Sequence, residues 1–92
     1  MITHIVFWQL KPEGKEQNAL QIKERLEALP GVIPGLLEAE VNRNKNGGEF
    51  DLCLLSRFES MKALHAYERH PEHLKIRAFV RSVIDKRAAV DF

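Results

Sequence analysis

Two segments of this sequence are typical of β-strands that are apolar on both faces. They span Ile2–Leu10 and Phe50–Phe58, and in each one apolar residues occupy both sets of alternating positions. Successive side chains of a strand point to opposite faces of the sheet, so both faces of these two strands need a cover. The fold therefore has to place this pair in the interior of a sheet and to shield that sheet on two sides.

The residues between these segments predict a helix, a strand and a turn. An amphipathic helix is expected over Lys15–Leu29, where apolar residues recur every three or four positions until Pro30 and Gly31 end it. A half-exposed strand is expected over Leu36–Asn42, with apolar side chains alternating with glutamates. The Asn- and Gly-rich stretch that follows is typical of a hairpin turn. The inward residues of the half-exposed strand are predicted to be Leu37, Ala39 and Val41.

The last third of the chain predicts two consecutive helices and a strand. Ser60 is a good N-cap for a helix that ends near Arg69, and Pro71 disfavours helical geometry at His70 while suiting the first turn of a new helix. A short final strand is expected over Ala88–Phe92. In the helix after Pro71, the residues expected to face inward are Leu74, Phe79, Val80, Val83 and Ile84, and those expected to face outward are Lys75, Arg77, Arg81 and Lys86.

The element order β-α-β-β-α-β predicts an α+β fold of the ferredoxin-like kind. In that topology a four-stranded antiparallel sheet has its first and third strands in the middle and its helices on one face. The two strands that are apolar on both faces are the first and the third. The opposite sheet face would then leave a large apolar patch in water unless something covers it. A second copy packed sheet to sheet is the simplest cover, so we expect a homodimer through the sheet face, a dimeric α/β barrel. The residues left for this contact are Ile5, Phe7, Cys53 and Leu55.

Composition limits the class of partner. The 92 residues predict one domain over 1–92, and the net charge of +1, from 14 basic against 13 acidic residues, argues against a nucleic-acid partner. No apolar run approaches the ~20 residues of a membrane-spanning helix, and the first residues lack the features of a signal peptide. The lone Cys53 excludes an intrachain disulfide. We therefore expect a cytoplasmic protein without a membrane partner.

The segment Tyr67–His73 concentrates groups that transfer protons near neutral pH. It holds a phenol and two imidazoles, and the predicted topology allows Tyr67 and His73 to share a cleft between sheet and helices with His4. These three are the candidate catalytic residues, because an imidazole can take a proton from an acidic carbon while a phenol hydrogen-bonds the developing oxyanion. Such chemistry requires no cofactor and takes a small-molecule ligand. The candidate ligand-binding residues are Val6, Trp8 and His70.

Three other interpretations stay open from the residues alone. The aromatic and imidazole groups can be structural, with His70 acting only as a helix cap. His70, His73 and His4 can instead ligate a metal, although no Cys or His-Glu-x-x-His pattern supports such a site. No phosphate-binding glycine motif or nucleophile elbow is present, so nucleotide binding and serine hydrolysis have no support. Whether the protein is an enzyme is left open.

Five groups of residues, in order along the whole chain, resemble the stress-responsive A/B barrel (Dabb) family. The Tyr-x-x-His-Pro-x-His segment is the most specific of them. The groups are His4–Phe7 with Lys11, Pro30–Gly35, Phe50–Leu52 with Phe58–Ser60, Ala66–His73, and Val90–Phe92.

The resemblance implies a dimeric α+β barrel. Many members of the family have no known activity and are described by stress induction, which implies a non-catalytic, stress-associated role as the alternative to an enzyme. One plant member is a cofactor-free polyketide cyclase, and by that likeness His73 is the general base, Tyr67 binds the carbonyl oxygen and His4 lines the same cavity. Similar barrels also serve as monooxygenases, which is a further alternative.

Overall fold

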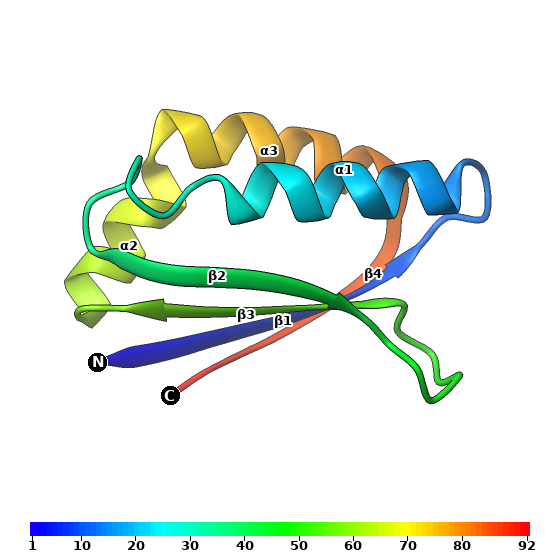
Figure 1. Ribbon diagram of the computed structural model, residues 1–92, viewed down its shortest axis with the longest axis horizontal. Helices are drawn as coiled ribbons and strands as arrows, with labels where there is room; N and C mark the ends of the chain where they lie inside the picture. The colour runs from blue at the N-terminus through cyan, green and yellow to red at the C-terminus, as the bar shows by residue number, and fades with distance from the viewer.

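The computed structural model describes residues 1–92 and contains one four-stranded antiparallel sheet (Figure 1). The helices α1 and α3 lie along one face of this sheet, and α2 closes one end of the same layer. The sheet order is β2-β3-β1-β4, so the two strands predicted to be central are central, and the ferredoxin-like fold is confirmed. The elements are β1 (Ile2–Leu10), α1 (Lys15–Glu27), β2 (Leu36–Arg43), β3 (Leu52–Phe58), α2 (Met61–Arg69), α3 (Pro71–Val83) and β4 (Ile84–Asp91).

The inner face of the sheet forms the core together with the helices. On β1 the residues at even positions from His4 to Leu10 are buried, because they alternate onto the face that α1 and α3 cover. Helix α1 contributes Ala19, Ile22 and Leu26 to the same core, as its apolar spacing predicts. Phe58 at the end of β3 is fully buried. The helical layer therefore satisfies one of the two apolar faces of the central strands.

The outer face of the sheet carries no helix. Its central residues are half-buried, and they pair across β1 and β3 as Ile5 with Leu55 and Phe7 with Cys53. On the neighbouring β4, Val90 pairs with Ile5 and is 55% exposed. An apolar surface thus runs across three adjacent strands, on the side where the sequence predicts a second copy.

A bulge in β2 changes the orientation of one residue relative to the prediction. Leu36 pairs with Phe58 and Glu38 with Arg57, so Leu37 is an extra residue in its strand. The bulge directs Leu37 outward, where it is 45% exposed, while Leu36 is buried in its place. The expected inward position of Leu37 is therefore wrong, whereas Val41 is buried as expected.

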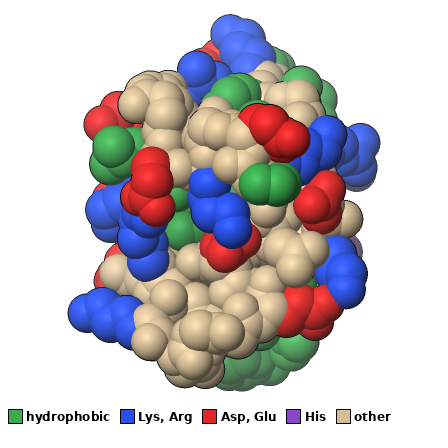
Figure 2. All heavy atoms as spheres, turned by 90° about the vertical axis from the view of Figure 1, so that its right-hand side faces the viewer, with side chains coloured by type: hydrophobic (Ala, Val, Ile, Leu, Met, Phe, Trp, Pro, Cys, Tyr) green, Lys and Arg blue, Asp and Glu red, His purple; other side chains and the backbone are tan.

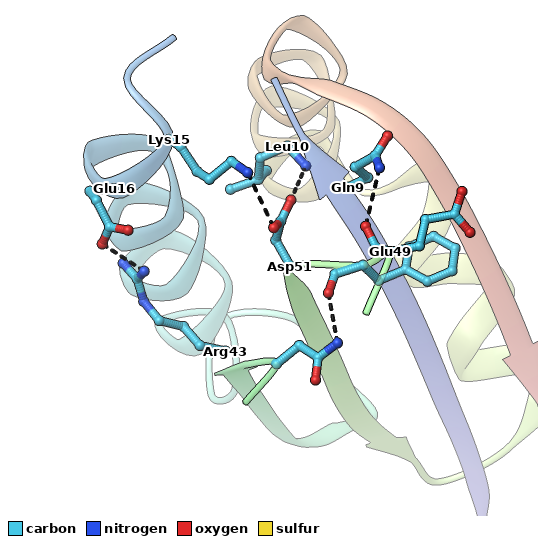
Figure 3. A network of polar contacts seen from close by, with 9 residues as sticks. Gln9, Leu10, Lys15, Glu16, Arg43, Glu49 and Asp51 are labelled. Carbon is cyan, nitrogen blue, oxygen red and sulfur yellow. Dashed lines mark hydrogen bonds and ion pairs between the residues drawn. The ribbon is translucent and has the colours of Figure 1, made fainter. Parts of the chain in front are cut away.

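The third strand begins at Leu52, two residues later than predicted, and the side chain of the preceding Asp51 joins β1 to α1 (Figure 3). The Asp51 carboxylate accepts hydrogen bonds from the backbone N–H of Leu10 at 2.7 Å and from Lys15 Nζ at 3.3 Å. The hairpin turn before it is confirmed: Asn44 Oδ1 accepts from the N–H of Asn46, and Gly47 has a positive φ of 72°.

The junction of α3 and β4 also differs from the prediction. The final strand starts at Ile84, four residues before the expected Ala88, because Ile84 is already extended and pairs with Leu10. On α3 the deepest residues are Ile76 and Val80, whereas Leu74, expected inward, is 43% exposed. Helical spacing from Ile76 places position 73 on the inner face and position 74 away from it.

Acidic and basic side chains are interspersed over the surface outside the cavity described below. Figure 2 shows this at the end of the molecule where α1 begins, with lysine and arginine side chains beside carboxylates. One such pair joins Arg43 to Glu16 at 2.6 Å (Figure 3). The even mixture agrees with the near-zero net charge of the chain.

Gly35 allows the loop before β2 to pass against α2, and its substitution tests this contact. A Cβ at Gly35 would lie 2.6 Å from the Cβ of Ala63, whereas one at Gly31 would meet no atom within 4 Å, and both glycines have φ near +85°. We expect Gly31→Ala to lower the free energy of unfolding by about 1 kcal/mol and Gly35→Ala by about 3 kcal/mol. Urea denaturation measures both values. Equal losses for the two variants would contradict the close contact.

Candidate functional site

A cavity of about 270 Å³ lies between the inner face of the sheet and the helices. This volume is close to the lower end of the range of small-molecule sites in proteins. Residues of both central strands, all three helices and β4 line it: His4, Val6, Trp8, Leu26, Leu54, Tyr67, Glu68, His73, Ile76, Arg77, Val80, Arg81, Ile84 and Arg87.

Five of the six residues singled out from the sequence line this cavity, and one does not. His4, Val6, Trp8, Tyr67 and His73 come together there from β1, α2 and α3. The sixth residue, His70, is the N-cap of α3, and its Nδ1 accepts a hydrogen bond from the backbone N–H of Glu72 at 3.1 Å. Because capping occupies its side chain outside the cavity lining, His70 is not placed to bind a ligand there.

The helix break at Pro71 brings Tyr67 and His73 together. His70 has an extended backbone with ψ of 134°, so α2 ends before it and α3 starts in a new direction at Pro71. The Tyr67 and His73 rings then stack with their centroids 4.1 Å apart. Phe58 packs edge-on against Tyr67 at 4.9 Å and holds the phenol in position.

His73 is uncharged in this setting at neutral pH. Its pKa is lowered to about 4, chiefly by burial and also by the positive charges of Arg77 and Arg87 and by the nearby His4, while the backbone of Glu68 opposes the shift. Its Nδ1 is buried and has no hydrogen-bond partner. A neutral imidazole combines one N–H donor with one acceptor nitrogen, so this ring can exchange a proton with a ligand.

Tyr67 remains a proton donor at physiological pH. Burial raises the pKa of its phenol well above the ordinary value, and the Glu68 carboxylate raises it further while Arg87 opposes the shift. A neutral phenol beside a neutral imidazole combines one hydrogen-bond donor with one acceptor at the same cavity wall.

His4 is oriented by Asp91 on the neighbouring strand. The two residues are paired in the register of β1 and β4, and the Nδ1–H of His4 donates to the Asp91 carboxylate. This contact assigns the proton to Nδ1 and leaves Nε2 as the acceptor nitrogen of His4. Sequence reasoning did not pair these two residues, because the register of strands separated by the whole chain cannot be derived from their sequences alone.

Sequence reasoning also missed the charged residues of the cavity. Arg77 and Arg81 were predicted to face outward; Arg81 is exposed as predicted and Arg77 is half-buried, and both line the cavity with Glu68 and Arg87. A one-turn spacing of two arginines is typical of a solvated helix face, so the pattern on α3 did not indicate that they also border a cavity. Arg87 was not singled out from the sequence; its pairing with Trp8 in the register of β1 and β4 places it on the inner face of the sheet.

The structure brings no metal-ligand set together. No group of three or more His, Cys, Asp or Glu side chains is arranged to hold a metal ion. His70 caps α3 while His73 lines the cavity, so the local His-x-x-His spacing does not bring the two imidazoles to one point.

Solved structures of several proteins share this architecture. A dimeric protein of unknown function and ferredoxin-like fold from Bacteroides fragilis is 30% identical, with a TM-score of 0.91 over 99% of this chain and 93% of its own. A dimeric ferredoxin-like protein of unknown function from Jannaschia is 22% identical, with a TM-score of 0.88 over 99% and 96%. The hydroxynitrile lyase of Passiflora edulis is 18% identical, with a TM-score of 0.87 over 99% and 90%, a likeness of fold alone.

These comparisons place the chain in the class of ferredoxin-like α+β proteins, and a family model identifies it more closely. The model of the Stress responsive A/B Barrel Domain, Dabb, matches residues 2–92. The chain therefore belongs to the Dabb family, as the sequence resemblance predicts. No curated protein matches it. None of its helices has the length and apolar character needed to cross a membrane, and cytoplasmic location stays a prediction.

The neutral state of His73 predicts a loss of stability in acid. The unfolded chain protonates this imidazole near pH 6.5, but the folded protein does so only near pH 4. Between these values the unfolded state binds more protons, so acidification lowers the free energy of unfolding, by about 2 kcal/mol after allowance for solvent screening of this ring. We expect His73→Gln to reduce the difference between unfolding at pH 7 and pH 4 by that amount. The exposed His65→Gln is the control, and an equal effect of both variants would contradict the assignment.

Proposed function

We propose that this protein binds a small organic ligand in the cavity and catalyses cofactor-independent acid/base chemistry on it, of the cyclase or isomerase kind. The observation that carries the proposal is the convergence of His4, Tyr67 and His73 on one cavity of about 270 Å³. The buried Nδ1 of His73 has no hydrogen-bond partner, a cost of about 1–3 kcal/mol that side chains selected only for stability would avoid.

The proposed reaction begins with abstraction of a proton next to a carbonyl group. The His73 imidazole takes the proton, and the electron pair of the broken C–H bond moves to the carbonyl oxygen. The Tyr67 hydroxyl donates a hydrogen bond to this developing oxyanion, and its high pKa keeps its proton in place. The Asp91-oriented His4 provides a second acceptor nitrogen for a proton transfer elsewhere on the ligand. No cofactor takes part in these steps.

A non-catalytic structural role is the alternative for the same residues. In that case His4, Tyr67 and His73 would satisfy one another in a filled core. The cavity of about 270 Å³ beside them and the lack of any partner for His73 Nδ1 favour the ligand-binding role. No feature of the cavity favours the monooxygenase alternative.

We also propose that the chain forms a homodimer through the outer face of the sheet, which makes the dimeric α/β barrel. The half-buried Ile5, Phe7 and Leu55 support this arrangement, since a second copy would remove them from water. The Bacteroides fragilis and Jannaschia proteins are described as dimeric, which agrees with it.

Conservative variants of the two stacked residues test the catalytic role. Ligands are first identified by thermal-shift screening of the wild-type protein, and exchange of their acidic C–H in D₂O is then followed by NMR. We expect His73→Phe to slow this exchange at least about 100-fold, and Tyr67→Phe to slow it by a similar factor, because each removes one proton-handling group and keeps an aromatic ring.

The structural alternative predicts a different result for the same variants. If His73→Phe and Tyr67→Phe each lowered the free energy of unfolding by about 2 kcal/mol or more and left ligand binding and exchange unchanged, the catalytic proposal would be wrong. The exposed His65→Phe on α2 controls for unspecific effects of the same substitution.

A charge on the outer sheet face tests the dimer. Light scattering after size exclusion should give twice the chain mass of 10.6 kDa for the wild-type protein at micromolar concentration. We expect Leu55→Glu to give the single mass, because it would bury a carboxylate in the interface. Leu20→Glu on α1, where Leu20 is 48% exposed, should leave the dimer intact. A stable wild-type monomer would contradict the proposal.

A further inference from the structure

The arginines of the cavity point to the chemical class of its ligand. We infer that the site selects an amphipathic organic anion, with an apolar body among the core side chains and a carboxylate or phosphate group against Arg77, Arg81 and Arg87. This inference rests on the proposed ligand-binding function and narrows it to a charge class.

The first argument is the local excess of positive charge. The whole chain has 14 basic and 13 acidic residues, yet three arginines and only one carboxylate, that of Glu68, line the cavity. The histidines there add no compensating negative charge. An anion is therefore the ligand that this wall favours electrostatically, whereas the rest of the surface favours neither sign.

The second argument is that these arginines are unpaired. Two other arginines of the chain, Arg43 and Arg57, form ion pairs with Glu16 and Glu38. None of the ion pairs in the protein includes Arg77, Arg81 or Arg87. Their guanidinium donors are available, and a planar guanidinium fits the oxygens of a carboxylate or phosphate with two parallel hydrogen bonds.

The third argument is where the arginines lie. Arg77 and Arg81 are one turn apart on α3, and Arg87 approaches from β4, opposite Trp8 in the register. The charges of Arg77 and Arg87 act on His73, and that of Arg87 also acts on Tyr67. An anion held there lies beside the stacked pair, and apolar side chains such as Val6 and Leu54 line the remaining wall for the body of the ligand.

An anion bound to this wall also changes the base. The groups that act on His73 are Glu68 and Tyr67 from α2, Arg77 from α3, Arg87 from β4 and His4 from β1. The two arginine charges disfavour protonation of the imidazole, and a bound anion offsets them. The ligand therefore raises the affinity of His73 for the proton that the proposed reaction transfers to it. Charge selection and base strength are coupled through the same arginines.

Matched ligands that differ in charge alone test the inference. The probes are butyrate, hexanoate, 3-phenylpropanoate and decanoate, each with its amide, and hexyl phosphate with hexanol as the phosphate arm. Calorimetry measures their binding to the dimer. We expect at least one anion to bind about tenfold more tightly than its neutral partner, as one charge-assisted contact allows. The two arms distinguish a carboxylate site from a phosphate site.

The Arg77→Gln, Arg87→Gln double variant should reduce this preference, because Arg81 alone remains, and should retain binding of the neutral partner. The matched control, Lys62→Gln with Arg69→Gln, removes the same number of charges from exposed positions of α2 outside the cavity, and it should keep the preference. NMR titration of His73 should show a higher pKa with the preferred anion in the wild-type protein and a smaller rise in the double variant.

The outcomes separate the two proposals. Equal binding of anions and neutral partners by the wild-type protein overturns the charge selection and leaves the ligand-binding site in place. A preference that is undiminished in the double variant overturns the role of these arginines. If no member of any pair binds, both the charge class and the ligand-binding function are overturned.

Discussion

The pairing of β1 with β3 is the constraint on which the rest of this structure depends. Both strands are apolar on two faces, so both lie in the interior of the sheet, and each face of the pair needs a cover that excludes water. The inner face is covered by α1 and α3, and this layer leaves the cavity between the helices and the sheet. The outer face has no cover within the chain. One pattern of residues thus explains the core, the place of the cavity and the surface proposed for the dimer.

The cavity combines features that oppose maximal stability. His73 is half-buried and its buried Nδ1 is unsatisfied, beside arginines that form no ion pair within the chain. A core selected only for stability would replace such groups with apolar side chains or pair them. A ligand that carries both a hydrogen-bonding group and a negative charge would explain why these groups surround one cavity. The proposed chemistry and the proposed charge class therefore depend on the same wall of α3 and β4.

Local patterns predicted most of the fold because each one restricts the backbone conformations that its own segment can adopt. The apolar alternation of β1, the cap at Ser60 and the break at Pro71 led to the correct elements, and Tyr67 and His73 were correctly placed on either side of the break. The errors lie where a neighbouring element decides the outcome. Leu37 turns outward through a bulge that depends on pairing with β3, and Ile84 belongs to β4 because it pairs with Leu10.

By itself the sequence determined the element order and the family, and it singled out the candidate residues around Pro71, since periodicity, proline and capping act within a few positions of one another. Only the tertiary structure decided which charges surround those residues. Asp91 reaches His4 through strand register, His70 is occupied as a cap, and Arg77 and Arg87 meet at one cavity from two elements. These contacts depend on how far apart the elements lie and how they are oriented. The electrostatic effect of a charge on the half-buried imidazole of His73 depends on the same distances and orientations.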